Sequence, residues 1–188
     1  MHVTQIDIPK KSLINNHLPA IHYSDCFTGE FRANQDIQVE TVARYFLNYN
    51  PTWLTWLMTL RNWLVKPFGL QTGDDSSPVL AITKGEKASF FDVLEVSDEE
   101  ILLYANDKHL SACFLVILSG LHHQYEITFS TTVHYHNNLG RIYFFFVKPF
   151  HILIIKAMLI RIIKKFSQTN KKLYHEKKCY NASCCREY

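Results

Sequence analysis

The clearest pattern in the chain is an alternation of apolar and polar residues between residues 124 and 136. In QYEITFSTTVHYH the odd positions carry mainly apolar side chains, and the even positions carry polar ones. A period of two is typical of a strand with one buried and one exposed face. Residues 88–97, 99–106 and 110–120 also have strand composition, and short polar turns separate them. Closely connected strands of this kind predict an antiparallel meander.

The segments before the meander predict one strand and two short helices. IHYSDCFTGEF (residues 21–31) is rich in aromatic residues and ends at a turn-prone Thr-Gly, so we expect a strand. Residues 37–48 have apolar side chains at helical spacing. A second helix is expected from Asn50, a capping residue, because Pro51 suits the first helical turn. Its three tryptophans, at positions 53, 56 and 63, are expected in the core.

A long C-terminal helix is predicted from the apolar period between residues 150 and 166. Asn137 or Asn138 can cap its start. Pro149 lacks an N–H group and is expected to kink or break the element near Val147–Lys148. No apolar period continues beyond residue 166.

These elements predict a single α+β domain over residues 20–166. Its curved antiparallel sheet would be followed by a long C-terminal helix packed on it, with the two short helices after the first strand. Residues 1–19 are expected to form an irregular arm, and residues 167–188 a mobile tail. With 188 residues and 47% apolar side chains, the chain is long enough to bury a sizeable core.

Charge is divided unevenly along the chain. Residues 1–155 carry a formal charge of −4, and residues 156–188 carry +7. A basic end can meet an anionic membrane or nucleic acid, but a solvated, frayed terminus is the favoured explanation. Nucleic acid is not expected as a partner, because the basic residues form no recognisable motif. A membrane span is not expected either, since Arg141, Lys148, Lys156 and Arg161 interrupt the apolar run.

The histidines raise the question of a metal site. His134 and His136 share one strand face, and a third ligand would have to come from His122, His123 or His151. The end of the chain offers another set, His175, Cys179, Cys184 and Cys185. Neither set has the spacing of a known metal motif, so we predict no metal. Phosphate-binding and nucleophile motifs are also missing, and no cofactor or catalytic residue is predicted.

The compartment is inferred from two features. The N-terminal residues lack the apolar stretch of a secretory signal, and five cysteines is an odd number with three of them crowded near the end. Both favour the cytoplasm.

Three segments together resemble a known family. LRNWLVKPFGLQTG, FDVLEVSDEEILLYANDKHL and TTVHYHNNLGRIYFFFVKPFH are similar to the bacterial family catalogued as domain of unknown function 2867, over roughly residues 20–166. The order of elements in that family resembles the helix-grip domains, the START-like and polyketide-cyclase-like proteins. The resemblance implies a sheet that grips the C-terminal helix around an apolar cavity, and it implies no catalytic residues.

We therefore expect a small apolar or amphipathic molecule to bind between sheet and helix. One alternative is a cyclase or isomerase in the same pocket, with His134, His136 or Tyr135 as acid or base. Alternation places these two histidines away from the enclosed side, which disfavours it. Another alternative is a module that contacts a membrane or protein through the basic end. The residues expected to line the ligand site are Phe114, Phe129, Val133, Tyr135, Ile152, Ile155 and Leu159.

Overall fold

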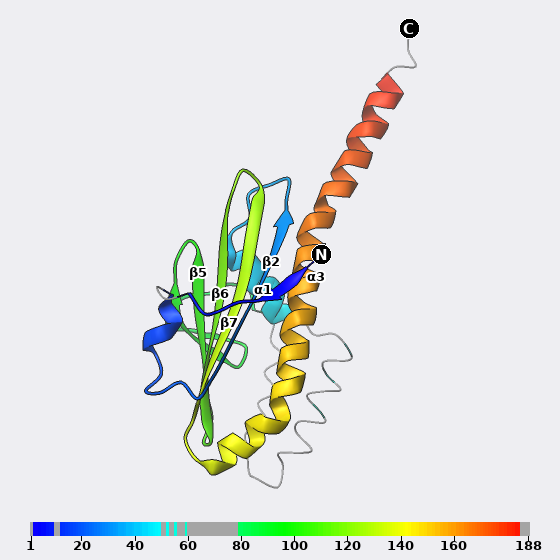
Figure 1. The fold of residues 1–188 in the computed structure, drawn as a ribbon. Helices are drawn as coiled ribbons and strands as arrows, with labels where there is room; N and C mark the ends of the chain where they lie inside the picture. Colours follow the sequence, from blue (N-terminus) through cyan, green and yellow to red (C-terminus); the bar gives the residue numbers. More distant parts are fainter. Residues whose placement is uncertain are drawn as a thin grey trace.

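The computed structural model describes residues 2–9, 12–49, 52, 55, 59 and 79–184, without the side chains of residue 16 and of residues 168–184. Within these ranges the chain forms a seven-stranded antiparallel sheet, the helices α1 and α3 and the 3-10 helix η1 (Figure 1). The elements in chain order are β1 (Val3–Gln5), η1 (Leu13–Asn16), β2 (Tyr23–Arg32), α1 (Val39–Asn48), β3 (Lys87–Ala88), β4 (Phe91–Val96), β5 (Glu100–Asn106), β6 (Leu110–Leu121), β7 (Gln124–Tyr135) and α3 (Asn138–Cys184).

The sheet has the strand order β1-β2-β7-β6-β5-β4-β3. β4 to β7 form the meander that the alternation predicted, and each pairs with its neighbour in sequence. β2 inserts beside β7, with Tyr23 opposite Val133 at one end and Arg32 opposite Gln124 at the other. β2 therefore lies between the edge strand β1 and β7, and β6 is the central strand of the sheet.

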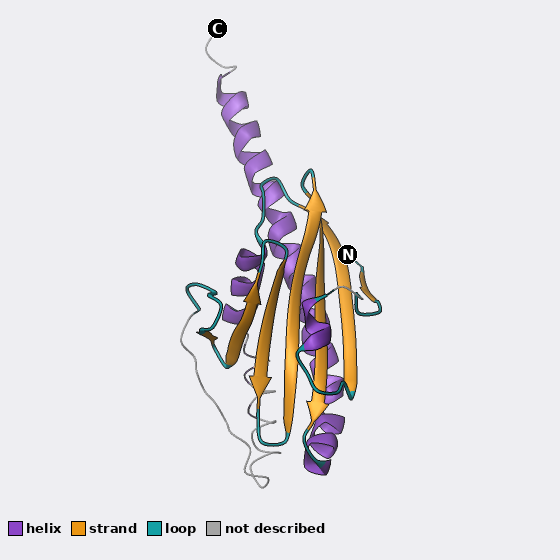
Figure 2. Cartoon of the chain, turned by 90° about the vertical axis from the view of Figure 1, so that its left-hand side faces the viewer, coloured by secondary structure: helices purple, strands orange, loops and turns teal. Residues whose placement is uncertain are grey.

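The two faces of the sheet are covered differently. Phe114, Val116 and Leu118 of β6 belong to the larger core, which also contains residues of α1 and α3. Cys113 and Leu115, at the alternate positions, belong to a smaller core with residues of η1. Figure 2 shows the sheet between η1 and α3, as the two clusters require. We call the side beneath α1 and α3 the helix face and the other side the η1 face.

Helix α3 lies close against β2 along the helix face. A Cβ atom at Gly29 would overlap the side chain of Ile163, so the absence of a side chain on β2 lets the helix approach there. About one helical turn further along the contact, the aromatic ring of Phe31 lies 6.2 Å from that of Phe166. Both α3 residues are buried in the larger core.

The start of α3 is fixed by a side-chain cap. Asn137 Oδ1 accepts a hydrogen bond from the backbone N–H of Gly140 at 3.1 Å, which confirms the predicted capping role. The prediction for Pro149 was a kink or a break; Pro149 lies inside α3, so the helix is not broken there. Figure 1 shows the first, yellow turns of the helix running at an angle to the rest, which is the bend that a proline produces.

Other predicted elements have mixed outcomes. The strand before the first helix and the helix at residues 37–48 are confirmed as β2 and α1. The predicted second helix and its tryptophans fall outside the described residues, apart from Thr52, Thr55 and Thr59, which are helical. The segment expected to be an irregular arm contains β1 and η1. Helix α3 continues to Cys184, through most of the segment expected to be a tail.

The fold class predicted from the sequence is confirmed: an α+β domain with a curved, unclosed antiparallel sheet and a long C-terminal helix packed on it. In the part of the chain that the structure describes, no helix has the length and apolar content needed to cross a bilayer.

Candidate functional site

Four polar residues lie together between the sheet and α3. At their centre is Asp25 of β2, which is only 4% exposed. Its Oδ2 accepts a hydrogen bond from the Tyr23 hydroxyl at 2.7 Å and lies 3.1 Å from Nε2 of His151 on α3. Thr131 of β7 is directly opposite Asp25 in the register of the two strands. We call Tyr23, Asp25, Thr131 and His151 the interface polar cluster.

Local periodicity brings these side chains to the helix face. Tyr23 and Asp25 are four and two residues before Phe27 in one strand, so all three share a face, and Phe27 is buried in the larger core. His151 precedes Ile155 by one helical turn, and Ile155 belongs to the same core. The polar cluster is therefore placed on a face that is otherwise apolar.

The protonation states of Asp25 and Tyr23 follow from their surroundings. Burial alone would raise the pKa of Asp25, but the imidazole of His151 and the hydroxyls of Tyr23 and Thr131 outweigh it and hold that pKa below its ordinary value. Burial, together with the hydrogen bond to Asp25 and its charge, raises the pKa of the Tyr23 hydroxyl far above its ordinary value. At neutral pH Asp25 is ionised and Tyr23 is protonated.

Part of the cluster's hydrogen-bonding capacity is unused. Among the described residues, Asp25 Oδ1 and Thr131 Oγ1 are buried without a hydrogen-bond partner. The contact between His151 Nε2 and Asp25 is short but is not aligned as a hydrogen bond. Buried polar atoms nearly always have a hydrogen-bond partner, so we expect these atoms to have one in the functional state. An ionised carboxylate oxygen can be satisfied only by a donor.

Aromatic and cationic groups surround the cluster toward the start of α3. The ring of Phe144 lies 4.8 Å from that of Tyr23 and 5.8 Å from that of Tyr135. Lys148 Nζ lies 4.8 Å from the centre of the Tyr23 ring. The His151 side chain is 18% exposed, so the cluster is not sealed from its surroundings.

The residues predicted to line a ligand site all lie at the sheet–helix interface. Phe129 and Leu159 are fully buried in the larger core, and Phe114 and Ile155 are nearly so. Ile152 is half-buried against the same core. Val133 lies opposite Tyr23, and Tyr135 is half-buried near Phe144. The structure thus brings the predicted residues together beside the polar cluster, while their role in binding stays a prediction.

The two strand histidines lie on the η1 face. His134 Nδ1 is 2.9 Å from the carbonyl oxygen of Ala20, and His136 Nε2 is 3.1 Å from the Ser111 hydroxyl. The ring of His22 stacks on that of His134 at 4.8 Å. Across the described ranges, no three His, Cys, Asp or Glu side chains are arranged to hold a metal ion. These histidines are accounted for by contacts with their neighbours.

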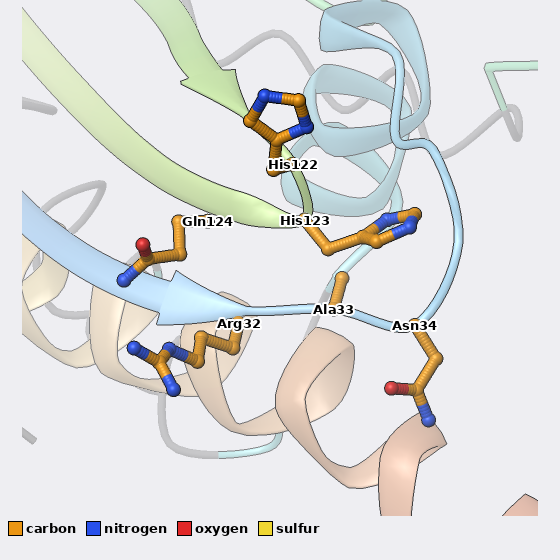
Figure 3. A pocket seen from close by; sticks show the side chains of 6 residues that line it. All are labelled: Arg32, Ala33, Asn34, His122, His123 and Gln124. Atoms are coloured by element: carbon orange, nitrogen blue, oxygen red, sulfur yellow. The ribbon is translucent and has the colours of Figure 1, made fainter.

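A surface depression of about 300 Å³ lies at the far end of the sheet, where β2 ends and the β6–β7 turn begins. Figure 3 shows Arg32 and Gln124 pointing away from His122, so the polar groups around it do not converge. None of the predicted ligand-binding residues lines it. Its lining residues are Arg32, Ala33, Asn34, His122, His123 and Gln124.

Comparison with known proteins identifies the family. A family model described as "Protein of unknown function (DUF2867)" matches residues 17–158. The chain belongs to the DUF2867 family. Searches of the curated proteins and of the solved structures returned no match. The matched segment contains all four residues of the interface polar cluster.

Sequence reasoning missed the central residue of the site in this DUF2867 chain. The sequence suggests His151 only as a third metal ligand, and it gives Tyr23 and Asp25 no role beyond that of strand residues. A signal was available, because Asp25 alternates with Tyr23 and Phe27 on the apolar face of its strand. A charged residue at such a position is rarely buried unless it is paired. What the sequence could not supply was the partner, which lies 126 positions away on α3.

The arrangement in this DUF2867 domain supports two kinds of chemistry. The free oxygen of Asp25 can accept a hydrogen bond from a bound hydroxyl or amine. The imidazole of His151 is held against a carboxylate through Nε2, which leaves Nδ1 as the nitrogen that can exchange a proton with a bound molecule. Binding and proton transfer both need a molecule that reaches the interface.

Proposed function

We propose that this DUF2867 domain binds a small amphipathic molecule between the helix face of the sheet and α3. The observation that carries the proposal is Asp25 Oδ1, a buried oxygen of an ionised carboxylate that accepts no aligned hydrogen bond among the described residues, although the Thr131 hydroxyl lies near the carboxylate. The apolar part of the molecule would lie against the predicted residues around Phe129 and Leu159. Burial of apolar surface supplies about 25 cal/mol per Å².

The side chains of the interface polar cluster limit which chemical group can form the polar end of the ligand. Asp25 offers only acceptor capacity, so the ligand must bring a donor. Lys148 lies close by, with its Nζ 4.8 Å from the Tyr23 ring centre, and a cationic amine would meet like charge there. A neutral hydroxyl group satisfies both conditions. We therefore expect an amphipathic alcohol.

The arrangement of elements supports the same proposal. In the helix-grip proteins, which the chain resembles, an antiparallel sheet and a long C-terminal helix enclose an apolar cavity. The α+β arrangement of β2, the meander and α3 has the same order. Two free, buried thiols, Cys26 and Cys113, suit a reducing compartment, and we place the protein in the cytoplasm on that ground.

The proposal is tested with a pair of matched probes. A fluorescent long-chain alcohol and its methyl ether have the same apolar body, but only the alcohol can donate a hydrogen bond. Both are titrated into wild-type protein and into Asp25→Asn, with fluorescence as the readout. The wild type should prefer the alcohol about tenfold, which corresponds to one buried hydrogen bond to a charged group. The variant should bind the two alike, because its amide can donate to the ether oxygen.

The control is Asp98→Asn, which alters an exposed carboxylate in the β4–β5 turn. It should keep the wild-type preference for the alcohol. If neither probe binds the wild type, the proposal of an amphipathic ligand is wrong. If both bind equally well to the wild type, Asp25 does not hold the polar end.

A second candidate function is acid–base catalysis in the same place. The alternative based on His134 and His136 is disfavoured, because both lie on the η1 face. The observation that favours catalysis is instead the 3.1 Å contact between Asp25 and His151. A carboxylate that orients an imidazole leaves the second ring nitrogen ready to remove a proton from a bound carbon acid and to return it.

Deuterium exchange tests the catalytic candidate without knowledge of the natural substrate. A medium-chain 2-alkanone is incubated with protein in heavy water, and its deuterium content is followed by mass spectrometry. Catalysis predicts faster incorporation with wild-type protein than with His151→Asn, at equal binding of the ketone. Equal rates with both proteins would limit the site to binding.

A further inference from the structure

The first half of α3 exposes an unusual number of large apolar side chains. The described residues contain twelve exposed large hydrophobics, and six of them fall between residues 139 and 153. Phe145 is 73% exposed, and Leu153 is 57% exposed. Isolated exposed apolar residues are ordinary, but a contiguous group marks an interaction surface. We call Leu139, Ile142, Phe145, Phe146, Phe150 and Leu153 the outer apolar stripe.

Helical spacing puts the stripe on the side of α3 that faces away from the sheet. Leu139, Ile142, Phe146, Phe150 and Leu153 follow one another at intervals of three or four residues, which keeps them on one face. The residues of α3 that contact the sheet, such as His151 and Ile155, lie on the opposite side. The outer apolar stripe therefore lies on the face of α3 opposite the one that packs on the sheet.

Charge along this part of α3 has a single sign. Between residues 138 and 167 the helix carries six Lys or Arg residues and no Asp or Glu. At 100° per residue, Arg141 lies beside Phe145, and Lys164 falls on the face of the stripe three turns beyond Leu153. Both are exposed, whereas Lys148 and Lys156 turn toward β2, with their Nζ atoms over the rings of Tyr23 and Phe27. An apolar face bordered by cations is the pattern of a helix that lies in the plane of a membrane surface.

We propose that the outer apolar stripe docks on an anionic lipid surface, with its rings at the boundary between headgroups and acyl chains. Arg141 and Lys164 would contact the lipid phosphates. A second copy of this chain is a poorer occupant, because pairing the same face across a two-fold axis would bring cations against cations. The docking is peripheral, and it does not depend on ligand binding on the other side of α3.

Vesicle binding tests the proposal with full-length protein. Flotation is compared for neutral phosphatidylcholine vesicles and for vesicles with 30% phosphatidylglycerol, at low and high salt. Phe145→Ser/Phe146→Ser should lower partitioning on the anionic vesicles about tenfold or more, since two large rings no longer enter the boundary. Arg141→Gln/Lys164→Gln should lower it as well and should weaken its salt dependence. The matched control is Leu80→Ser/Leu121→Ser, two exposed leucines elsewhere, and it should bind like the wild type.

A third variant distinguishes the contribution of the basic C-terminal residues to vesicle binding from that of the outer apolar stripe. Replacing Lys171, Lys172, Lys177 and Lys178 by Gln should leave most of the binding, because the stripe supplies the apolar contact. The proposal is overturned if the phenylalanine variant floats like the wild type, or if the wild type does not float with anionic vesicles. It is also overturned if the wild type is a dimer by sedimentation and the phenylalanine variant is a monomer, which would assign the stripe to a second copy.

Discussion

At the scale of single residues, Asp25 is the most informative position in the protein. A buried carboxylate on an apolar face is costly unless its charge is paired. Tyr23 and His151 supply that pairing, each through the same oxygen, Oδ2. The remaining oxygen is the group around which the proposed function is built. The contacts of Asp25 Oδ2 and the unused Oδ1 lead to separate predictions.

Replacing Asp25 by Ala removes the centre of the cluster and leaves Tyr23 and His151 without their shared partner. Breaking a buried pair in this way costs about 3 kcal/mol of the free energy of unfolding. Urea denaturation measures the loss. Asp98→Ala, at an exposed site, should stay within about 0.5 kcal/mol of the wild type. A stability of Asp25→Ala equal to the wild type would mean that the pairing is not formed.

The pH dependence of stability reports the same carboxylate. The pKa of Asp25 is lower in the folded protein than its ordinary value of 3.8, so the folded state binds the proton more weakly than the unfolded state. Its contribution is complete above that ordinary value and is lost as the pH falls through the folded pKa. The difference in unfolding free energy between wild type and Asp25→Asn should therefore shrink with acidification, as measured by urea titrations across the acid range. A difference that grows with acidification would contradict the assignment.

The two buried cysteines should be unreactive in the folded protein. Burial raises the pKa of Cys113 to about 11 and also raises that of Cys26. Thiolate is the reactive form, so both should resist iodoacetamide at pH 8 and react quickly in denaturant. Peptide mapping by mass spectrometry distinguishes them from the three cysteines near the C-terminus. Native-state labelling of Cys113 at the rate of a free peptide thiol would show that it is not buried.

At the scale of elements, the join between the meander and α3 is set by Gly140 and Asn137. A Cβ atom on Gly140 would overlap the carbonyl oxygen of His109, in the turn between β5 and β6. In an ordinary helix, replacing Gly by Ala stabilises by up to about 1 kcal/mol. Here Gly140→Ala should instead lower the melting temperature. The comparison is Leu139→Ala, whose side chain is 41% exposed and should change stability little. A stabilised Gly140→Ala would mean that the helix does not start against this turn.

Periodic elements could be predicted from the sequence, and short or interrupted ones could not. β7 has twelve residues of alternation, while β1 and β3 have three and two residues, too few to show a period. The sequence predicts a kink or a break at Pro149 and cannot decide between them; the position is exposed on the outward side of α3. A carbonyl left unpaired there can bond to water, so the helix bends and continues.

At the scale of the whole molecule, two opposite faces of α3 carry the two proposed sites. The inner face closes the interface polar cluster, and the outer face carries the outer apolar stripe. The residues predicted to bind a ligand lie on the inward faces of the sheet and of α3, because strand alternation and helix period each identify such a face; their role in binding stays a prediction. The meeting of Asp25 with His151 depends on how β2 inserts beside β7 and how α3 crosses them. Such long-range pairing leaves no local pattern in the chain.

The central claim is that a ligand lies between the sheet and α3, and photo-crosslinking tests its location most directly. A long-chain alcohol with a diazirine on its apolar tail is bound to the full-length protein, irradiated and mapped by peptide mass spectrometry. The account predicts labels around Phe129–Tyr135 of β7 and His151–Leu159 of α3, and their loss with excess unlabelled alcohol. Labels confined to the outer apolar stripe, or to the depression around Arg32 and His123, would contradict it.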